Sequence, residues 1–165
     1  MDVAFLVDKT KSVGTANFLL LKGFLLELTA GLQIGRESTH VGIILFAKHA
    51  KVIHKFADEN LYSNEAVHRA ISNIPVALNS PTFTDKAIIA ADKKLFTEAD
   101  GDRPKFPNVM IVLTDGKTNE KSKPFAEITA SLKVSSQTYL DPGHKIELSL
   151  ARAKPKLIPS RGTCL

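Results

Sequence analysis

Two stretches decide the fold: VAFLVD at residues 3–8 and VMIVLTD at residues 109–115. Each is a short, continuous apolar run that ends in an aspartate. Such runs are typical of strands that are buried on both faces, as in a parallel sheet. We therefore expect strands at 3–7 and 109–113. Asp8 and Asp115 should then lie at the carboxyl end of the sheet, where open α/β folds bind their ligands.

The segments around these two runs alternate between strands and amphipathic helices. VGIILF at residues 41–46 predicts another buried strand, and the alternating KVIHKF at 51–56 predicts a half-exposed edge strand in a hairpin with it. Helical spacing of apolar residues predicts helices at 15–33, 66–74, 84–97 and 121–133. This order indicates an α/β fold: a doubly wound, mostly parallel sheet flanked by helices, with one antiparallel edge strand.

The C-terminal part of the sequence has a different character. Between 134 and 150 only Ile146, Leu148 and Leu150 alternate usefully, and the chain beyond Ala151 is rich in Lys and Pro. Residues 129–165 carry six Lys and Arg against two Asp and Glu, within a chain of net charge +5. We therefore expect a domain at 1–133 and a divergent, basic, poorly ordered tail at 134–165.

Composition excludes several classes of protein. With 165 residues, 44% hydrophobic and 24% charged, the chain fits one globular domain, and its single cysteine, Cys164, forms no intrachain disulfide. The run at 3–7 is too short for a signal peptide, and the apolar stretch at 18–28 contains charges, so we expect no membrane insertion. The body is nearly neutral, and the basic tail has one aromatic residue, Tyr139, so we expect no nucleic-acid partner.

Oxygen-bearing side chains gather in three segments next to the predicted strand ends. Asp8, Thr10 and Ser12 form a D-x-T-x-S pattern after the first strand. Thr82 precedes the helix at 84–97, and Asp115 follows the last buried strand. Mg²⁺ prefers oxygen ligands, uses one or two carboxylates and keeps some waters. These five residues predict a site for one divalent cation, Mg²⁺ or else Mn²⁺ or Ca²⁺, with a coordination position left open.

The sequence resembles the von Willebrand factor type A domains of matrilins, fibril-associated collagens and integrins. The matching segments, in family order over about residues 1–128, are MDVAFLVDKTKSV, NFLLLKGFLLEL, THVGIILFAKHAKVIHKF, SPTFTDKAI and RPKFPNVMIVLTDGKTNE. The resemblance implies a metal-ion-dependent adhesion site with Asp8, Thr10 and Ser12 in one loop, Thr82 in another and Asp115 in a third. It implies a protein-binding module whose partner, an extracellular matrix protein such as collagen, offers an acidic residue to the cation.

This sequence departs from the family pattern in three places. Thr10 stands where the family has its first serine, and Lys9 and Lys11 place positive charge beside the site. The closing strands and helix of the family are not recognisable after about residue 133. We therefore expect an incomplete domain, belonging to a longer extracellular matrix or cell-surface parent that supplies the export signal.

Three alternatives stay open at this stage. Strand-end aspartates often only cap the following helix. The chain could also be a metal-free copy that acts in protein association alone. The remaining alternative is an enzyme. Asp8-x-Thr10 faintly resembles the first motif of Mg²⁺-dependent phosphatases that use an aspartate nucleophile. That motif needs a second aspartate, as general acid, where Thr10 stands. We therefore expect no enzyme.

Overall fold

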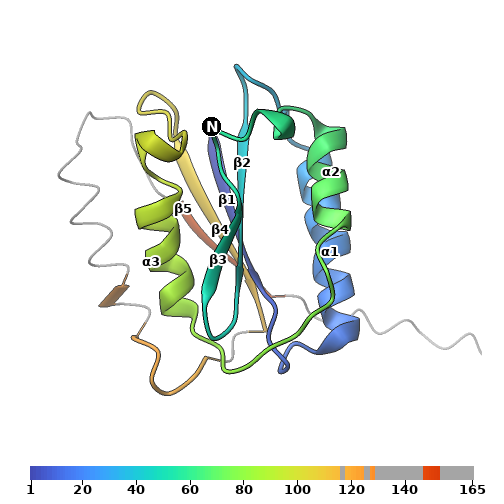
Figure 1. Cartoon of the computed structure of the whole chain (residues 1–165), viewed down its shortest axis with the longest axis vertical. Helices are drawn as coiled ribbons and strands as arrows, with labels where there is room; N and C mark the ends of the chain where they lie inside the picture. Colours follow the sequence, from blue (N-terminus) through green and yellow to red (C-terminus); the bar gives the residue numbers. More distant parts are fainter. Residues whose placement is uncertain (116–117, 125–126, 129–146, 153–165) are drawn as a thin grey trace, which may run out of the picture.

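A five-stranded sheet forms the centre of the computed structural model, which describes residues 1–115, 118–124, 127–128 and 147–152 (Figure 1). The strand order is β3-β2-β1-β4-β5. The strands are β1 (Asp2–Asp8), β2 (His40–Phe46), β3 (Ala50–His54), β4 (Asn108–Thr114) and β5 (Glu147–Arg152). All neighbours pair in parallel except β2 and β3, which form the antiparallel hairpin. The expected α/β fold with one antiparallel edge strand is confirmed.

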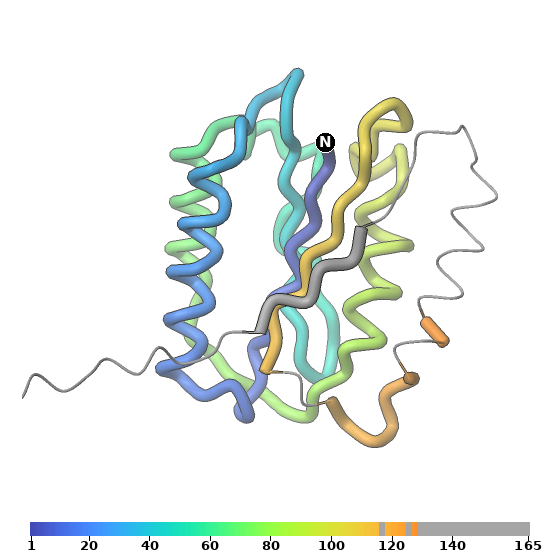
Figure 2. Tube along the Cα trace, turned by 180° about the vertical axis from the view of Figure 1, so that it is seen from behind, coloured from blue at the N-terminus to red at the C-terminus, as the bar shows by residue number. Residues whose placement is uncertain are grey.

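Helices cover both faces of this sheet. The α-helices are α1 (Gly14–Ala30), α2 (Asn64–Ser72) and α3 (Thr84–Lys94), and the short 3₁₀ helices are η1 (Glu59–Leu61) and η2 (Glu98–Asp100). Helices α1 and α2 lie against one face and α3 against the other, as both views show (Figures 1 and 2). None of the helices in the described ranges is both long and apolar enough to cross a membrane.

The observed helix ends differ slightly from the predicted ones. Helix α2 begins after Ser63, whose hydroxyl accepts a hydrogen bond from the backbone of Ala66. Helix α3 ends at Lys94 rather than 97, because Leu95 leaves the helical conformation to bury its side chain. Most of the helix expected at 121–133 lies outside the described residues; 121–122 form a turn, and 127–128 are helical.

The two apolar cores explain why β1 is a continuous hydrophobic run. Every residue of β1 is buried. Phe5 and Val7 point into the core under α1 and α2, whereas Ala4 and Leu6 point into the core under α3. A strand covered on both faces has no solvent side, so no polar residues alternate within it.

Strand β5 is the main difference from the sequence analysis. It pairs in parallel with β4 from Val109↔Glu147 to Thr114↔Arg152. Only the alternation of Ile146, Leu148 and Leu150 indicated it, so no closing strand was expected there. The rest of 134–165 lies outside the described residues, and the expected division at 133 stays a prediction there.

Candidate metal site

The carboxylate of Asp8 is held at the end of β1 by two hydrogen bonds. The backbone N–H of Thr10 donates to its Oδ1 at 2.9 Å, and the hydroxyl of Thr114 donates to its Oδ2 at 2.7 Å. Asp8 is fully buried. Thr114 lies in the neighbouring strand β4, so the parallel pairing of β1 and β4 is what positions this carboxylate. Sequence reasoning missed Thr114, although it directly precedes Asp115.

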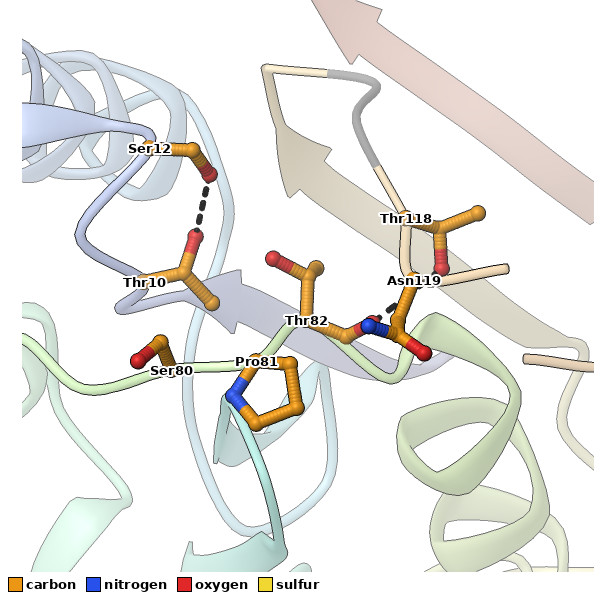
Figure 3. Close-up of a pocket in the computed structure, with 7 residues that line it drawn as sticks. All are labelled: Thr10, Ser12, Ser80, Pro81, Thr82, Thr118 and Asn119. Atoms are coloured by element: carbon orange, nitrogen blue, oxygen red, sulfur yellow. Dashed lines mark hydrogen bonds between the residues drawn. The ribbon is translucent and has the colours of Figure 1, made fainter. Parts of the chain in front are cut away.

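The loop after β1 presents two hydroxyls to one another. The side-chain oxygens of Thr10 and Ser12 are hydrogen bonded at 2.9 Å (Figure 3). The loop is fixed in place by Asn79, whose backbone donates to Lys9 at 3.0 Å and accepts from Lys11 at 2.8 Å. Asn79 was not predicted as part of the site, because its role depends on contacts with a loop that is distant in the sequence.

Thr82 reaches the same place from the segment between α2 and α3. Its hydroxyl points toward Thr10 in Figure 3. The segment is anchored on both sides, because Phe83 donates its N–H to the carbonyl of Ala47 at 3.1 Å and Asn119 donates to the carbonyl of Thr82 at 2.8 Å. The backbone of Thr82 is therefore rigidly placed, and its side chain is left to face the loop after β1.

The three predicted hydroxyls border one open pocket of about 260 Å³. Its lining residues are Thr10, Ser12, Ser80, Pro81, Thr82, Thr118 and Asn119 (Figure 3). The two predicted carboxylates are not among them. Asp8 lies next to the pocket-lining Thr10, whose backbone N–H donates to it. Asp115 is half-buried and directly follows β4. The structure thus brings the three hydroxyls together at one pocket, with Asp8 hydrogen bonded to the backbone of Thr10; their role as metal ligands stays a prediction.

The electrostatics of Asp8 suit a cation. Burial raises the pKa of Asp8, and the negative charge of Asp115 raises it further. The hydrogen bonds from Thr114 and Thr10 act in the opposite direction and stabilise the charged form. Two carboxylates that repel one another inside a buried site become mutually compatible when a positive ion shares their field.

The donor set fits a hard divalent cation. It offers carboxylate and hydroxyl oxygens and no sulfur or imidazole. No group of three or more His, Cys, Asp or Glu side chains that could hold a metal occurs within the described residues. Few anionic ligands and an open pocket agree with Mg²⁺, which keeps waters or external oxygens in its shell.

Two further polar residues, Thr84 and Asp85, lie at the start of α3 next to Thr82. Thr84 lies 3.5 Å from Thr118, hydroxyl to hydroxyl, and does not line the pocket. Asp85, in the first turn of α3, is buried and accepts a hydrogen bond of 2.8 Å from the hydroxyl of Ser122. This contact ties α3 to the segment after β4, which carries Thr118 and Asn119.

Comparison with known proteins shows the family to which the chain is similar. The family model of the von Willebrand factor type A domain matches residues 2–139. Matrilin-3 of Gallus gallus is 32% identical over 124 residues, which are 73% of this chain and 27% of that protein. Cochlin of Bos taurus is 33% identical over 115 residues, 70% of this chain and 20% of cochlin. The collagen alpha-5(VI) chain of Mus musculus is 30% identical over 120 residues, 73% of this chain and 4% of that one.

The chain therefore spans about a quarter or less of these relatives. Among solved structures, proximal thread matrix protein 1 from the mussel byssus, described with a zinc-occupied MIDAS motif, is similar with a TM-score of 0.72 and 22% identity. The match covers 90% of this chain and 35% of the mussel protein. At this identity the likeness establishes the shared fold.

Proposed function

Because the chain belongs to the von Willebrand factor type A family, we propose that it is a cation-dependent protein-binding module and not an enzyme. One observation carries the proposal: three hydroxyls from two separate loops, those of Thr10, Ser12 and Thr82, converge on one open pocket with Asp8 directly behind it. Names among the relatives, matrilins, cochlin and a collagen VI chain, support an extracellular matrix setting.

We propose that Thr10, Ser12 and Thr82 supply hydroxyl ligands to one Mg²⁺ ion. Asp8 and Asp115 supply the negative charge that retains it. Held by these residues, the ion would supply the positive charge that attracts an external carboxylate. Zinc is reported for the mussel protein; an all-oxygen donor set in this chain favours Mg²⁺, with Mn²⁺ or Ca²⁺ as substitutes.

The partner in this proposal is an extracellular matrix protein, such as a collagen, that offers an acidic side chain to the ion. A carboxylate from outside completes the coordination shell and neutralises the remaining charge. The buried position of Asp8 argues against a nucleophilic role, because both of its oxygens accept hydrogen bonds and its side chain is shielded from solvent. Thr10 in place of a second aspartate argues in the same direction.

A thermal melt tests the proposal without knowledge of the partner. Mg²⁺ at a hundred times its dissociation constant should stabilise the folded chain by about 2.7 kcal/mol relative to EDTA. For a domain of this size that corresponds to a rise of roughly 5–10 °C in Tm. Asp115→Asn should abolish the rise, whereas the control Asp92→Asn, in the later part of α3, should keep it.

Two results would contradict the metal assignment. One is an equal rise in Tm for Asp115→Asn and for the unmodified chain. The other is a cooperative melt that responds to none of Mg²⁺, Mn²⁺ and Ca²⁺, which would instead favour a metal-free copy that acts in protein association alone.

A further inference from the structure

Four lysines lie close in sequence to residues that line or anchor the pocket, on the β1–α1 loop, in the β2–β3 turn and in the first turns of α3. They are Lys9, Lys11, Lys48 and Lys86, which we call the lysine rim. Lys11, Lys48 and Lys86 are exposed, and Lys9 is partly buried. Within the described ranges, the ion pairs that involve lysine are Lys55–Asp100 and Lys123–Glu127, so no ion pair there neutralises the rim.

Lys86 is the best-fixed member of the lysine rim. Its ammonium lies 3.9 Å from the centroid of the Phe83 ring and 3.3 Å from the carbonyl oxygen of Lys48. Phe83 directly follows Thr82, which lines the pocket. The aromatic face and the carbonyl both attract the ammonium and thereby hold it over Phe83, the residue after the pocket-lining Thr82.

The other members approach from the neighbouring loops. Lys48 follows Ala47, whose carbonyl accepts the N–H of Phe83 at 3.1 Å. Lys9 and Lys11 flank Thr10 in the chain and bind Asn79 through their backbones. The lysine rim therefore belongs to the β1–α1 loop, the β2–β3 turn and the start of α3, three segments at the carboxyl end of the strands where the pocket lies.

Acidic residues at this end of the sheet do not balance these charges. Asp8 and Asp85 are buried, and Asp115 is half-buried. Among the described residues of these loops, Glu120 is the exposed acid. A divalent cation held by Asp8 and Asp115 forms a neutral centre, so the positive charge of the lysine rim stays uncompensated.

We propose that the lysine rim selects an acidic peptide segment, one that carries further carboxylates on both sides of the residue that enters the pocket. This inference rests on the proposed function, because the central carboxylate binds at the cation site. A peptide is favoured over a sulfated polysaccharide, since a pocket of about 260 Å³ lined by hydroxyls suits a single carboxylate, and the lysines on the adjoining segments suit further carboxylates on either side of it. Such charges act mainly on specificity and on the association rate.

Two labelled peptides of nine residues test this in fluorescence anisotropy. One has a single central glutamate in a Gly/Ser background, and the other has five glutamates spread along its length. In Mg²⁺ at low ionic strength the second should bind more tightly, by about ten-fold at typical strengths of exposed ion pairs. This preference should shrink as salt screens the lysines.

Two variants that each lose three positive charges test whether the position of the lysines, and not only the net charge of the chain, determines the preference. The rim variant carries Lys11→Gln, Lys48→Gln and Lys86→Gln, and the control carries Lys93→Gln, Lys94→Gln and Lys105→Gln. The control lysines are exposed and lie at the last turn of α3 and before β4, at the other end of the sheet. The rim variant should lose most of the preference for the five-glutamate peptide, and the control should keep it.

The outcomes separate this inference from the proposed function. If EDTA abolishes binding but the rim and control variants behave alike, the lysine rim has no selective role and the inference is wrong. If the rim variant alone loses the preference, while EDTA removes the binding of the single-glutamate peptide, both proposals are supported. Tighter binding of a heparin fragment than of the five-glutamate peptide would overturn the choice of an acidic peptide.

Discussion

Burial of Asp8 in the folded chain opposes the charged carboxylate that binding of a cation requires. Burial raises the pKa of Asp8, and the nearby charge of Asp115 raises it further, so both oppose the charged carboxylate in the folded chain. The hydrogen bonds from Thr10 and Thr114 keep the carboxylate oriented for the charged form. A bound cation would remove this conflict, because its positive charge favours the carboxylate that burial opposes.

The isosteric change Asp8→Asn should expose this conflict. The pKa of Asp8 is higher in the folded chain than in the unfolded chain, so the folded chain binds the Asp8 proton more tightly. The stability that this proton contributes is fully present below the unfolded-state pKa and is lost as pH rises through the folded-state pKa. In EDTA at pH 7–8 the variant should therefore have a higher Tm than the unmodified chain, and the difference should narrow toward pH 4. In saturating Mg²⁺ the order should reverse.

The measurement is a set of melts across pH in EDTA and in Mg²⁺. A lower Tm for Asp8→Asn at every pH in EDTA would contradict this account. It would mean that the charged hydrogen bonds of Asp8 outweigh the cost of its burial.

At the scale of the element, α1 presents two different faces. Phe18, Leu21 and Leu25 are fully or almost fully buried against the sheet. On the outer side Leu19, Leu20 and Phe24 are 51%, 55% and 42% exposed. The helix is therefore apolar on both sides, and its sequence alone does not say which residues face the core.

Two substitutions within α1 should differ strongly in cost. Phe18→Ala removes a fully buried ring and should lower the free energy of unfolding by about 3–5 kcal/mol. Phe24→Ala removes a ring that is 42% exposed and should cost about 1 kcal/mol, because much of its surface already contacts water. Urea unfolding of both variants checks this. Equal losses would show that Phe24 is buried in solution by a surface that covers the outer face of α1.

Elements with strong local signals were the ones that the sequence predicted. The buried strands at 3–7, 41–46 and 109–113 match β1, β2 and β4 closely, since strands covered on both faces need continuous apolar runs. Helix ends were less accurate, because residues such as Leu95 leave the helix in order to reach the core. The partners Asn79 and Thr114 could not be predicted, because their roles depend on contacts between distant segments.

At the scale of the molecule, the two ends of the sheet have different electrostatic designs. At the end opposite the pocket, Asp2 is fully buried and receives hydrogen bonds from Nε, Nη2 and the backbone of Arg103 at 3.0, 2.6 and 2.9 Å. The same guanidinium also donates to the carbonyl of Ser38 at 2.6 Å. That end is closed by a satisfied ion pair. At the pocket end, the hydroxyls of Thr10, Ser12 and Thr82 line an open pocket, and Lys11, Lys48 and Lys86 are exposed.

The contribution of β5 to the whole molecule can be tested by shortening the chain. A chain of residues 1–152 retains β5 and should melt within about 2 °C of the full chain, a shift that corresponds to less than about 1 kcal/mol. A chain of residues 1–146 lacks β5, so the whole length of β4 from Asn108 to Thr114 becomes an unpaired edge. Each backbone hydrogen bond lost there costs about 0.5–1.5 kcal/mol, and an exposed edge promotes association between chains.

We therefore expect 1–146 to have a clearly lower Tm and to scatter light at concentrations at which 1–152 stays clear. Equal melts of the two chains would contradict the role of β5 and would support a folded unit that ends near residue 133, as the composition of 134–165 predicts. If 1–152 is also destabilised, residues 153–165 must contribute contacts of their own. The rise in Tm that Mg²⁺ produces in each chain then shows whether the cation site depends on β5. Asp115 directly follows β4, the strand that pairs with β5. We therefore expect Mg²⁺ to raise the Tm of 1–146 less than it raises the Tm of 1–152.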